Sequence, residues 1–213
     1  MNSRAKGQAG KNRLLRGTGT REAILASAAS LFASVGYSSV SMREIAKGAG
    51  ITPGALYNHF RDKSALYSAT MEHALGDRMS GLSEDLRADA SCEERFRALV
   101  VGMIKLFDEN EIFARLMHRE LLDGDDTRLE FVTKNVLQDP FGSVVDLMAE
   151  FDTGRDPQLL ASLVTCSIVG HFEFHRVRRN YIGYKPSQDD PAEIADTATN
   201  FLLAGLLEMG RTS

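Results

Sequence analysis

The sequence predicts an all-α protein, in which a small three-helix domain at the N-terminus precedes a larger helical bundle. Three observations support this fold class. Apolar residues recur at helical spacing in one segment after another, helix-capping residues mark the starts of several segments, and β-branched residues never alternate over a usable strand length. The 213 residues, 43% hydrophobic and 25% charged, suffice for a substantial buried core.

The chain opens with a basic segment that has little to fold around. Residues 1–19 contain five basic residues, no acidic ones, and only Leu14 and Leu15 as large aliphatic side chains behind Met1. A segment that can bury so little apolar surface is expected to form a disordered arm. The first helix is expected to begin at Thr20, a suitable N-cap, and to end at Gly36, where a left-handed backbone is needed.

Two short helices with well-marked ends follow. Ser41 and Glu44 have the spacing of a capping box, and Gly50 ends the helix that they begin. Thr52 is the next N-cap, and Pro53 stands at the first helical position, where its missing N–H has no cost. Two short helices joined by a tight turn make a helix-turn-helix, a motif whose second helix enters the major groove of DNA.

The rest of the sequence predicts further helices. They lie near residues 63–88, 92–109, 111–122, 126–151 (broken around Pro140), 157–181 and 191–209. We therefore divide the chain into the basic arm (1–19), a helix-turn-helix domain (20–66) and a helical body (67–213).

The net charge of −4 conceals two regions of opposite sign. Residues 1–63 contain ten Lys or Arg and three acidic residues, which gives +7, whereas the remainder has fifteen basic and twenty-six acidic residues, which gives −11. A basic head suits a polyanion such as DNA. A chance clustering of solvated charges is the alternative.

Several classes of site and location have no support in the sequence. The longest apolar runs, such as residues 201–207, fall far short of the roughly 18 residues of a membrane span, and the N-terminus lacks the apolar core of a secretory signal. Cys92 and Cys166 are the only cysteines and neither belongs to a CxxC pair. No GxSxG or Walker motif is present. We expect a cytoplasmic protein without membrane association, catalytic residues, cofactor or metal.

The stretch from Thr20 to about Leu75 resembles the N-terminal domain of the TetR family of bacterial repressors. The matching elements are Phe32-x-x-x-Gly36-Tyr37, Ile45-Ala46-x-x-Ala49-Gly50-Ile51 and Leu56-Tyr57-x-His59-Phe60-x-x-Lys63-x-x-Leu66. The resemblance implies a homodimer that binds a palindromic operator in double-stranded DNA and leaves it when a small-molecule effector binds.

The resemblance also implies which side chains contact the DNA backbone. Tyr57, His59 and Lys63 match phosphate-contacting positions, and each carries a suitable hydrogen-bond donor. Thr52 adds its hydroxyl at the start of a helix. Tyr57 packed on the next helix and His59 as an ordinary polar residue are the alternatives.

Base readout has fewer candidates. Arg43 matches a base-reading position, where a guanidinium can bind O6 and N7 of guanine, although a solvated surface arginine is the alternative. In the second helix, Pro53, Gly54 and Ala55 offer little beyond methyl contacts.

The end of the chain predicts a dimer interface. The last helix is apolar all round in its second half, so a partner is expected to cover one of its faces. The preceding helix supplies small residues suited to close helix approach. The residues expected at this interface are Gly170, Ala198, Phe201, Leu202 and Gly205. Two buried helices of a monomer are the alternative.

The middle helices combine aromatic and methionine stripes with a few polar residues, as adaptable ligand pockets do. The residues expected to bind the effector are Met103, Phe107, Phe113, Met117, His118, Glu120, Ser167, His171 and Phe174. An ordinary hydrophobic core is the alternative for the apolar members.

The segment around residue 175 carries histidines and arginines. His171 and His175 have the i, i+4 spacing of a zinc site, but Glu173 is in the wrong place for a metalloprotease base, and ordinary packing is the preferred interpretation. We expect Arg178 and its arginine neighbours to form a solvated face or to complement the helix dipole.

Two other functions compete with a ligand-responsive regulator. An architectural DNA-binding protein would bind DNA without responding to a small molecule, and a small helical enzyme would show turnover.

Overall fold

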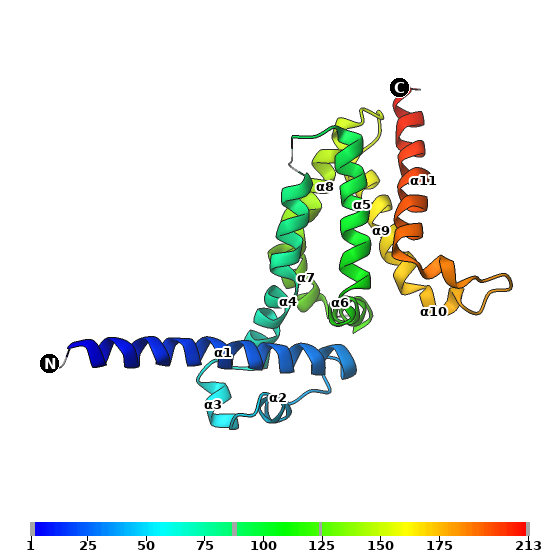
Figure 1. Ribbon diagram of the computed structural model, residues 1–213. Coiled ribbons are helices and arrows are strands. Elements are labelled where there is room, and N and C mark those ends of the chain that lie inside the picture. Colours follow the sequence, from blue (N-terminus) through cyan, green and yellow to red (C-terminus); the bar gives the residue numbers. More distant parts are fainter. Residues whose placement is uncertain (1–2, 87–88, 124, 212–213) are drawn as a thin grey trace. The chain divides into compact units, whose positions relative to one another are not determined.

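The computed structural model describes residues 3–86, 89–123 and 125–211, and within them every regular element is a helix (Figure 1). The elements are α1 (Ser3–Val35), α2 (Met42–Gly48), α3 (Pro53–Tyr57), α4 (Lys63–Leu86), α5 (Cys92–Asp108), α6 (Glu111–Asp123), α7 (Asp126–Val132), the π-helical turn η1 (Thr133–Leu137), α8 (Gln138–Glu150), α9 (Pro157–Glu173), α10 (His175–Arg178), the 3-10 turn η2 (Pro186–Asp189) and α11 (Pro191–Arg211). The predicted all-α fold is confirmed. None of the described helices is long and apolar enough to span a membrane.

The chain divides into two compact units, and the division differs from the predicted one at residue 66. The first unit comprises Met1–Ala74 and Arg115–Asp125, and the second comprises Leu75–Ala114 and Asp126–Ser213. The boundary therefore lies inside the continuous helix α4. Most of α6 belongs to the first unit although the sequence assigns it to the body.

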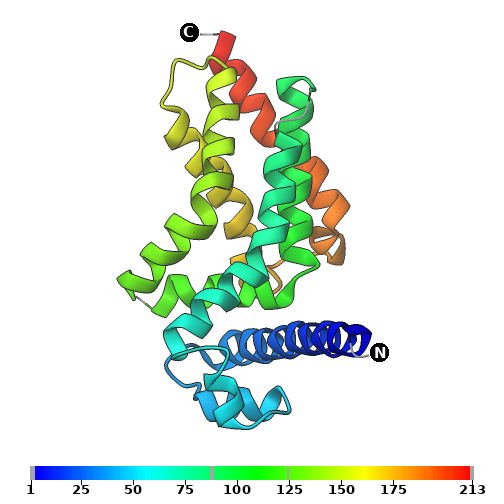
Figure 2. The ribbon, with the colours of Figure 1, turned by 90° about the vertical axis from the view of Figure 1, so that its left-hand side faces the viewer.

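In the first unit, α2 packs against α1, and α3 packs against α2 (Figure 2). Ile24, Leu25 and Phe32 of α1 are fully or almost fully buried, as are Ile45 of α2 and Leu56 of α3. This is the apolar set that the spacing of the sequence predicts.

The helix ends of this unit follow the predicted chemistry. The Ser41 hydroxyl accepts a hydrogen bond from the Glu44 amide, and the Glu44 carboxylate accepts one from the Ser41 amide at 2.8 Å. Thr52 caps α3 by accepting from the Ala55 amide at 3.2 Å. Gly50 adopts a φ of +68°, so the turn between α2 and α3 needs the left-handed backbone that glycine provides.

The backbone of α1 departs from the expectation of a disordered arm. The helix does not begin at Thr20 but continues back to Ser3. Residues 3–19 contain no proline and include strong helix formers such as Ala5, Lys6 and Leu15, so nothing stops the helix from propagating backwards from its folded part. The prediction was based on the little apolar surface that residues 1–19 can bury, and it did not consider that a helix can extend backwards from a folded part.

The second unit is a helical bundle with one continuous core. In Figure 1, α5 lies beside α11, and α8 packs against α9. Phe96, Leu99 and Val100 of α5 are fully buried at the centre of this core, with Leu206 of α11 and Leu147 of α8 packed around them. The predicted body is therefore helical as expected.

Two predicted helices of the body are interrupted. The break expected around Pro140 lies earlier, at the π-helical turn Thr133–Leu137, and Pro140 itself is buried in the first turn of α8. Proline lacks an amide for the carbonyl four residues before it and its ring clashes there, so the backbone widens just upstream. The helix expected over 157–181 ends at Glu173, and Phe174 separates it from the short helix α10.

Candidate nucleic-acid interface

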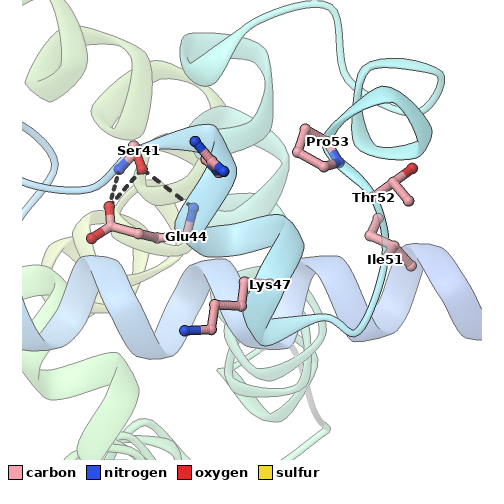
Figure 3. Close-up of a pocket in the computed structure, with 7 residues that line it drawn as sticks. Ser41, Glu44, Lys47, Ile51, Thr52 and Pro53 are labelled. Carbon is pink, nitrogen blue, oxygen red and sulfur yellow. Dashed lines mark hydrogen bonds between the residues drawn. The ribbon is translucent and has the colours of Figure 1, made fainter.

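The helix-turn-helix carries a shallow groove on its exposed side. It has a volume of about 630 Å³ and runs between α2 and the start of α3 (Figure 3). The residues that line it are Ser41, Arg43, Glu44, Lys47, Ile51, Thr52 and Pro53. Arg43 and Lys47 lie one turn apart on the exposed face of α2, because Ile45 and Ala46 anchor the opposite face in the core.

The capping box determines the electrostatics of this groove. Figure 3 shows the Glu44 side chain turned back toward Ser41, whose hydroxyl donates to the carboxylate at 2.6 Å. Hydrogen bonds from the Ser41 side chain and backbone lower the pKa of Glu44. The one acidic group of the groove is thus bound at the positive end of the helix, where anions are stabilised.

The second helix of the motif presents its N-terminus and one exposed face. Thr52, Pro53 and Gly54 are exposed, and Ala55 is half-buried. A Cβ added to Gly54 would meet no atom within 4 Å, so the backbone there is open to close approach by a large partner. The Thr52 hydroxyl oxygen caps the helix, while its hydrogen remains a donor.

Tyr57 and His59 point away from the core, as the resemblance implies. The Tyr57 side chain is 54% exposed, and His59 is exposed as well. Leu56 and Phe60, which flank them in the chain, are buried and hold the end of the motif against the core. Both polar side chains can therefore reach a phosphate without unfolding any part of the motif.

Lys63 is held by the protein instead of extending into solvent. Its ammonium group lies 4.4 Å from the centre of the Tyr37 ring and donates to the Ser38 carbonyl at 3.3 Å. Tyr37 in turn packs edge-on against Tyr67, with ring centres 5.1 Å apart. A positive charge at this place is built into the first unit, so substitution of Lys63 would alter packing as well as charge.

Three exposed polar residues beside the predicted ones were not anticipated as DNA contacts. Lys47 lines the groove, Asn58 lies between Tyr57 and His59, and the Arg61 side chain is 85% exposed while pairing with Asp62 at 3.0 Å. The signal for Lys47 was present in the sequence, because it follows Arg43 by one helical turn.

The predicted effector-binding residues are divided between the two units. Met117, His118 and Glu120 belong to the first unit, and the other six belong to the second. Glu120, which the sequence analysis expects to bind the effector, has a buried carboxylate that accepts a hydrogen bond from Tyr67 of α4. Most of α6, the helix that carries Glu120, packs as part of the first unit.

Within the second unit, the remaining candidates fall into three environments. Met103, Phe107 and Phe113 are core residues. Ser167 and Phe174 are exposed, and the Ser167 hydroxyl donates to the Leu163 carbonyl at 2.7 Å, so neither lines an interior cavity. His171 alone combines a polar side chain with partial burial.

The helices expected to dimerise expose apolar side chains. Phe201 of α11 is 76% exposed, and Leu159 and Leu163 of α9 are exposed to a similar degree. Among the five predicted interface residues, Phe201 and Gly205 are exposed, and Gly170, Ala198 and Leu202 are half-buried.

The two histidines of the possible zinc site have no further ligand nearby. Across the described ranges, no three His, Cys, Asp or Glu side chains are grouped so that they could hold a metal ion. Nδ1 of His175 lies 2.7 Å from the Phe172 carbonyl oxygen, an ordinary contact at a helix end.

Known solved structures share this fold. The chain is similar to the fatty acid degradation regulator FadR of Bacillus halodurans, with a TM-score of 0.72 at 19% identity over 87% of this chain and 95% of that one. It is equally similar to the regulator FadR of Bacillus subtilis in complex with stearoyl-CoA, with a TM-score of 0.72 at 17% identity over 86% of this chain and 98% of that one. At such identities the likeness concerns the fold.

Sequence relatives match part of the chain. The chain is similar to the HTH-type transcriptional regulator AcrR of Shigella flexneri, with 55% identity over 53 residues, which are 25% of each protein. It is 32% identical over 97 residues to the HTH-type transcriptional activator FasR of Mycolicibacterium smegmatis, which covers 46% of this chain and 44% of that protein. The chain thus spans a quarter to less than half of these curated relatives.

A protein family matches the helix-turn-helix. Residues 24–70 match the family described as bacterial regulatory proteins, tetR family. The match includes α2, α3 and the groove between them, and the relatives above are regulators with a helix-turn-helix. Within residues 24–70 the chain thus contains the region that characterises the tetR family of bacterial regulatory proteins.

Proposed function

We propose that the protein is a transcriptional repressor, which binds a palindromic operator as a homodimer and is released from it by a small molecule. The exposed face of the helix-turn-helix is the observation that carries the proposal. The side chains exposed on this face are those of Arg43, Lys47, Thr52, Tyr57 and His59. Glu44 is the acidic residue that lines the groove, and its carboxylate accepts a hydrogen bond from Ser41.

The residues of this face divide by the DNA group that each can recognise. Tyr57, His59 and Lys47 can donate to phosphate oxygens, which positions the motif without reading sequence. Arg43 can bind guanine in the major groove, and Pro53 and Ala55 can contact thymine methyl groups. The open backbone at Gly54 allows the N-terminus of α3 to approach the bases closely.

The exposed apolar residues of α9 and α11 support a dimer. Leu159, Leu163 and Phe201 are large side chains that one chain leaves in water. Burying them against a second copy is favourable at about 25 cal/mol per Å² of apolar surface. A twofold dimer presents two heads to two half-sites, which in helix-turn-helix proteins lie about one DNA turn, roughly 34–36 Å, apart.

Selection of bound DNA from a random pool tests the proposal. We expect an enriched palindrome, and affinity that falls steeply with salt because the phosphate contacts release counterions. A panel of small molecules added to the selected complex then separates a ligand-responsive regulator from an architectural protein. Recovery of no preferred sequence, or binding that is insensitive to salt, would contradict the proposal.

A further inference from the structure

Two buried nitrogen atoms of the second unit lack hydrogen-bond partners. They are Nε2 of His171, near the end of α9, and Nε of Arg178, at the end of α10, and neither has a partner among the described residues. More than nine in ten buried polar groups in proteins are paired, so each such atom needs an explanation. The two belong to neighbouring helices, and the Arg178 charge acts on the His171 ring.

The Arg178 guanidinium is held in place from its other side. Its Nη1 donates to the Gln188 carbonyl at 3.3 Å, and its Nη2 donates to the Asp189 carboxylate at 3.2 Å. Asp189 is itself fixed by Tyr184 at 2.6 Å and by Arg179 at 2.7 Å. This contact contradicts the predicted solvated face at Arg178, because η2 folds back onto α10. Nε is the nitrogen of this guanidinium that has no hydrogen-bond partner.

The electrostatics favour an acceptor with a negative charge. Two guanidinium groups, those of Arg178 and Arg179, share the one Asp189 carboxylate, so the three side chains together carry a positive charge. Burial, and then the Arg178 charge, lowers the pKa of His171, so that its ring is neutral at neutral pH and carries one N–H. A carboxylate has two oxygens and can accept from Nε of Arg178 and from Nε2 of His171 when the neutral ring carries its proton on Nε2.

A row of aromatic rings ends at His171. The ring centres of Phe113 and Phe107 are 5.2 Å apart, those of Phe107 and Phe172 are 5.4 Å apart, and those of Phe172 and His171 are 5.7 Å apart. Phe107 and Phe113 are buried, so the row is an apolar strip inside the unit that ends at the polar ring of His171. An apolar strip with a polar group at its end can hold a small molecule with one polar end when the surrounding side chains move apart.

We infer that His171 and Arg178 bind the carboxylate of a small organic acid, whose apolar part lies along the rings of Phe172, Phe107 and Phe113. The inference rests on the proposed function, since this acid would be the effector. Protein atoms cover both nitrogens, so the carboxylate reaches them through a local rearrangement of the chain. Pairing two buried donors stabilises the rearranged state, and this differential affinity is what an effector needs in order to shift a conformational equilibrium.

Calorimetric titration of the full chain with hexanoate, octanoate and decanoate, and with decan-1-ol, tests the inference. We expect decanoate to bind at least about tenfold more tightly than decan-1-ol, because a charge-assisted hydrogen bond contributes more than a neutral one. Arg178→Lys keeps the positive charge beside Asp189 but removes Nε, and His171→Phe keeps a ring. Each should reduce the preference for decanoate about tenfold and leave decan-1-ol binding unchanged.

Arg176→Lys is the matched control, because Arg176 is an exposed arginine of the same short helix. Equal affinity for decanoate and decan-1-ol, equal losses in Arg176→Lys and Arg178→Lys, or no binding of the three carboxylates would overturn the inference. DNA binding is measured on the same samples. A wild type that binds no DNA contradicts the proposed function, whereas normal DNA binding without carboxylate recognition contradicts only the site.

Discussion

The Tyr67 hydroxyl donates a hydrogen bond to the Glu120 carboxyl group, and both side chains are almost completely buried although 53 residues separate them. Arg119 reinforces the connection by donating to the Ser34 carbonyl, at the end of α1, at 2.8 Å. These two contacts explain why Arg115–Asp125 belongs to the first unit. The first unit is therefore completed by a segment that lies far along the chain.

Removing the buried hydroxyl should destabilise the first unit. We expect Tyr67→Phe to lower the free energy of unfolding by about 1–3 kcal/mol, because it removes a hydrogen-bond donor from a buried carboxyl group. Tyr57→Phe makes the same chemical change at an exposed site. It should leave stability unchanged and weaken DNA binding. Denaturant unfolding and DNA titration of both variants check this pair, and equal stability losses would contradict it.

Arg43 and Lys47 should affect DNA binding in different ways. Arg43→Ala is expected to weaken the free energy of operator binding by roughly 1–3 kcal/mol and to reduce the preference for one particular base pair in each half-site. Lys47→Ala should weaken binding to all sequences and reduce the log–log salt slope by about 1. Competition with single-base variants of the operator measures both effects. A uniform loss in Arg43→Ala would assign Arg43 to the phosphate backbone instead.

The turn between α2 and α3 depends on glycine at one position only. An alanine at Gly50 would meet no neighbour within 4 Å, but the φ of +68° costs a non-glycine residue about 1–2 kcal/mol. Gly54→Ala is the control, since this glycine is helical and also open, and alanine there should stabilise the unit by roughly 0.5–1 kcal/mol. Thermal unfolding of the two variants should shift in opposite directions.

A charge on α11 should prevent dimerisation. Phe201→Glu places a carboxylate on the exposed apolar face, and we expect sedimentation to show monomers that bind the operator far more weakly than wild type. Leu122→Glu, at a leucine of α6 that is 69% exposed, should leave the dimer intact. Monomeric wild type at micromolar concentration would refute the dimer.

The exposed position of Ser167 on α9 means that Ser167→Phe, too, is expected to disturb dimerisation.

The stability of the second unit should depend on the protonation of His171. Burial and Arg178 lower the pKa of this histidine below its ordinary 6.5, so protons bind the unfolded chain more readily than the folded one. The stability that the neutral ring contributes is present above pH 6.5 and is lost as the pH falls through the folded-state pKa. Between about pH 7.5 and about pH 5, wild type should lose more thermal stability than His171→Gln does. Glutamine at the exposed His175 should not change the slope.

Much of the candidate DNA interface could be predicted from the sequence because its determinants are local. The cap of Ser41 and Glu44, the cap of Thr52 and the turn at Gly50 involve residues within a few positions of each other. Helical spacing then decides which side chains are buried and which are exposed. The same spacing would have identified Lys47 beside Arg43.

The sequence by itself determined that the fold is all-α, and it determined the capping and the exposed polar face of α2 and α3, since these follow from interactions between near neighbours. Only the tertiary structure decided that Glu120 belongs to the first unit and that Lys63 lies against Tyr37. It also decided that Arg178 pairs with Asp189 while its Nε atom is buried. Each of these depends on which distant segments pack together. A long-range pair forms where packing brings two side chains within reach, and no spacing along the chain encodes that distance.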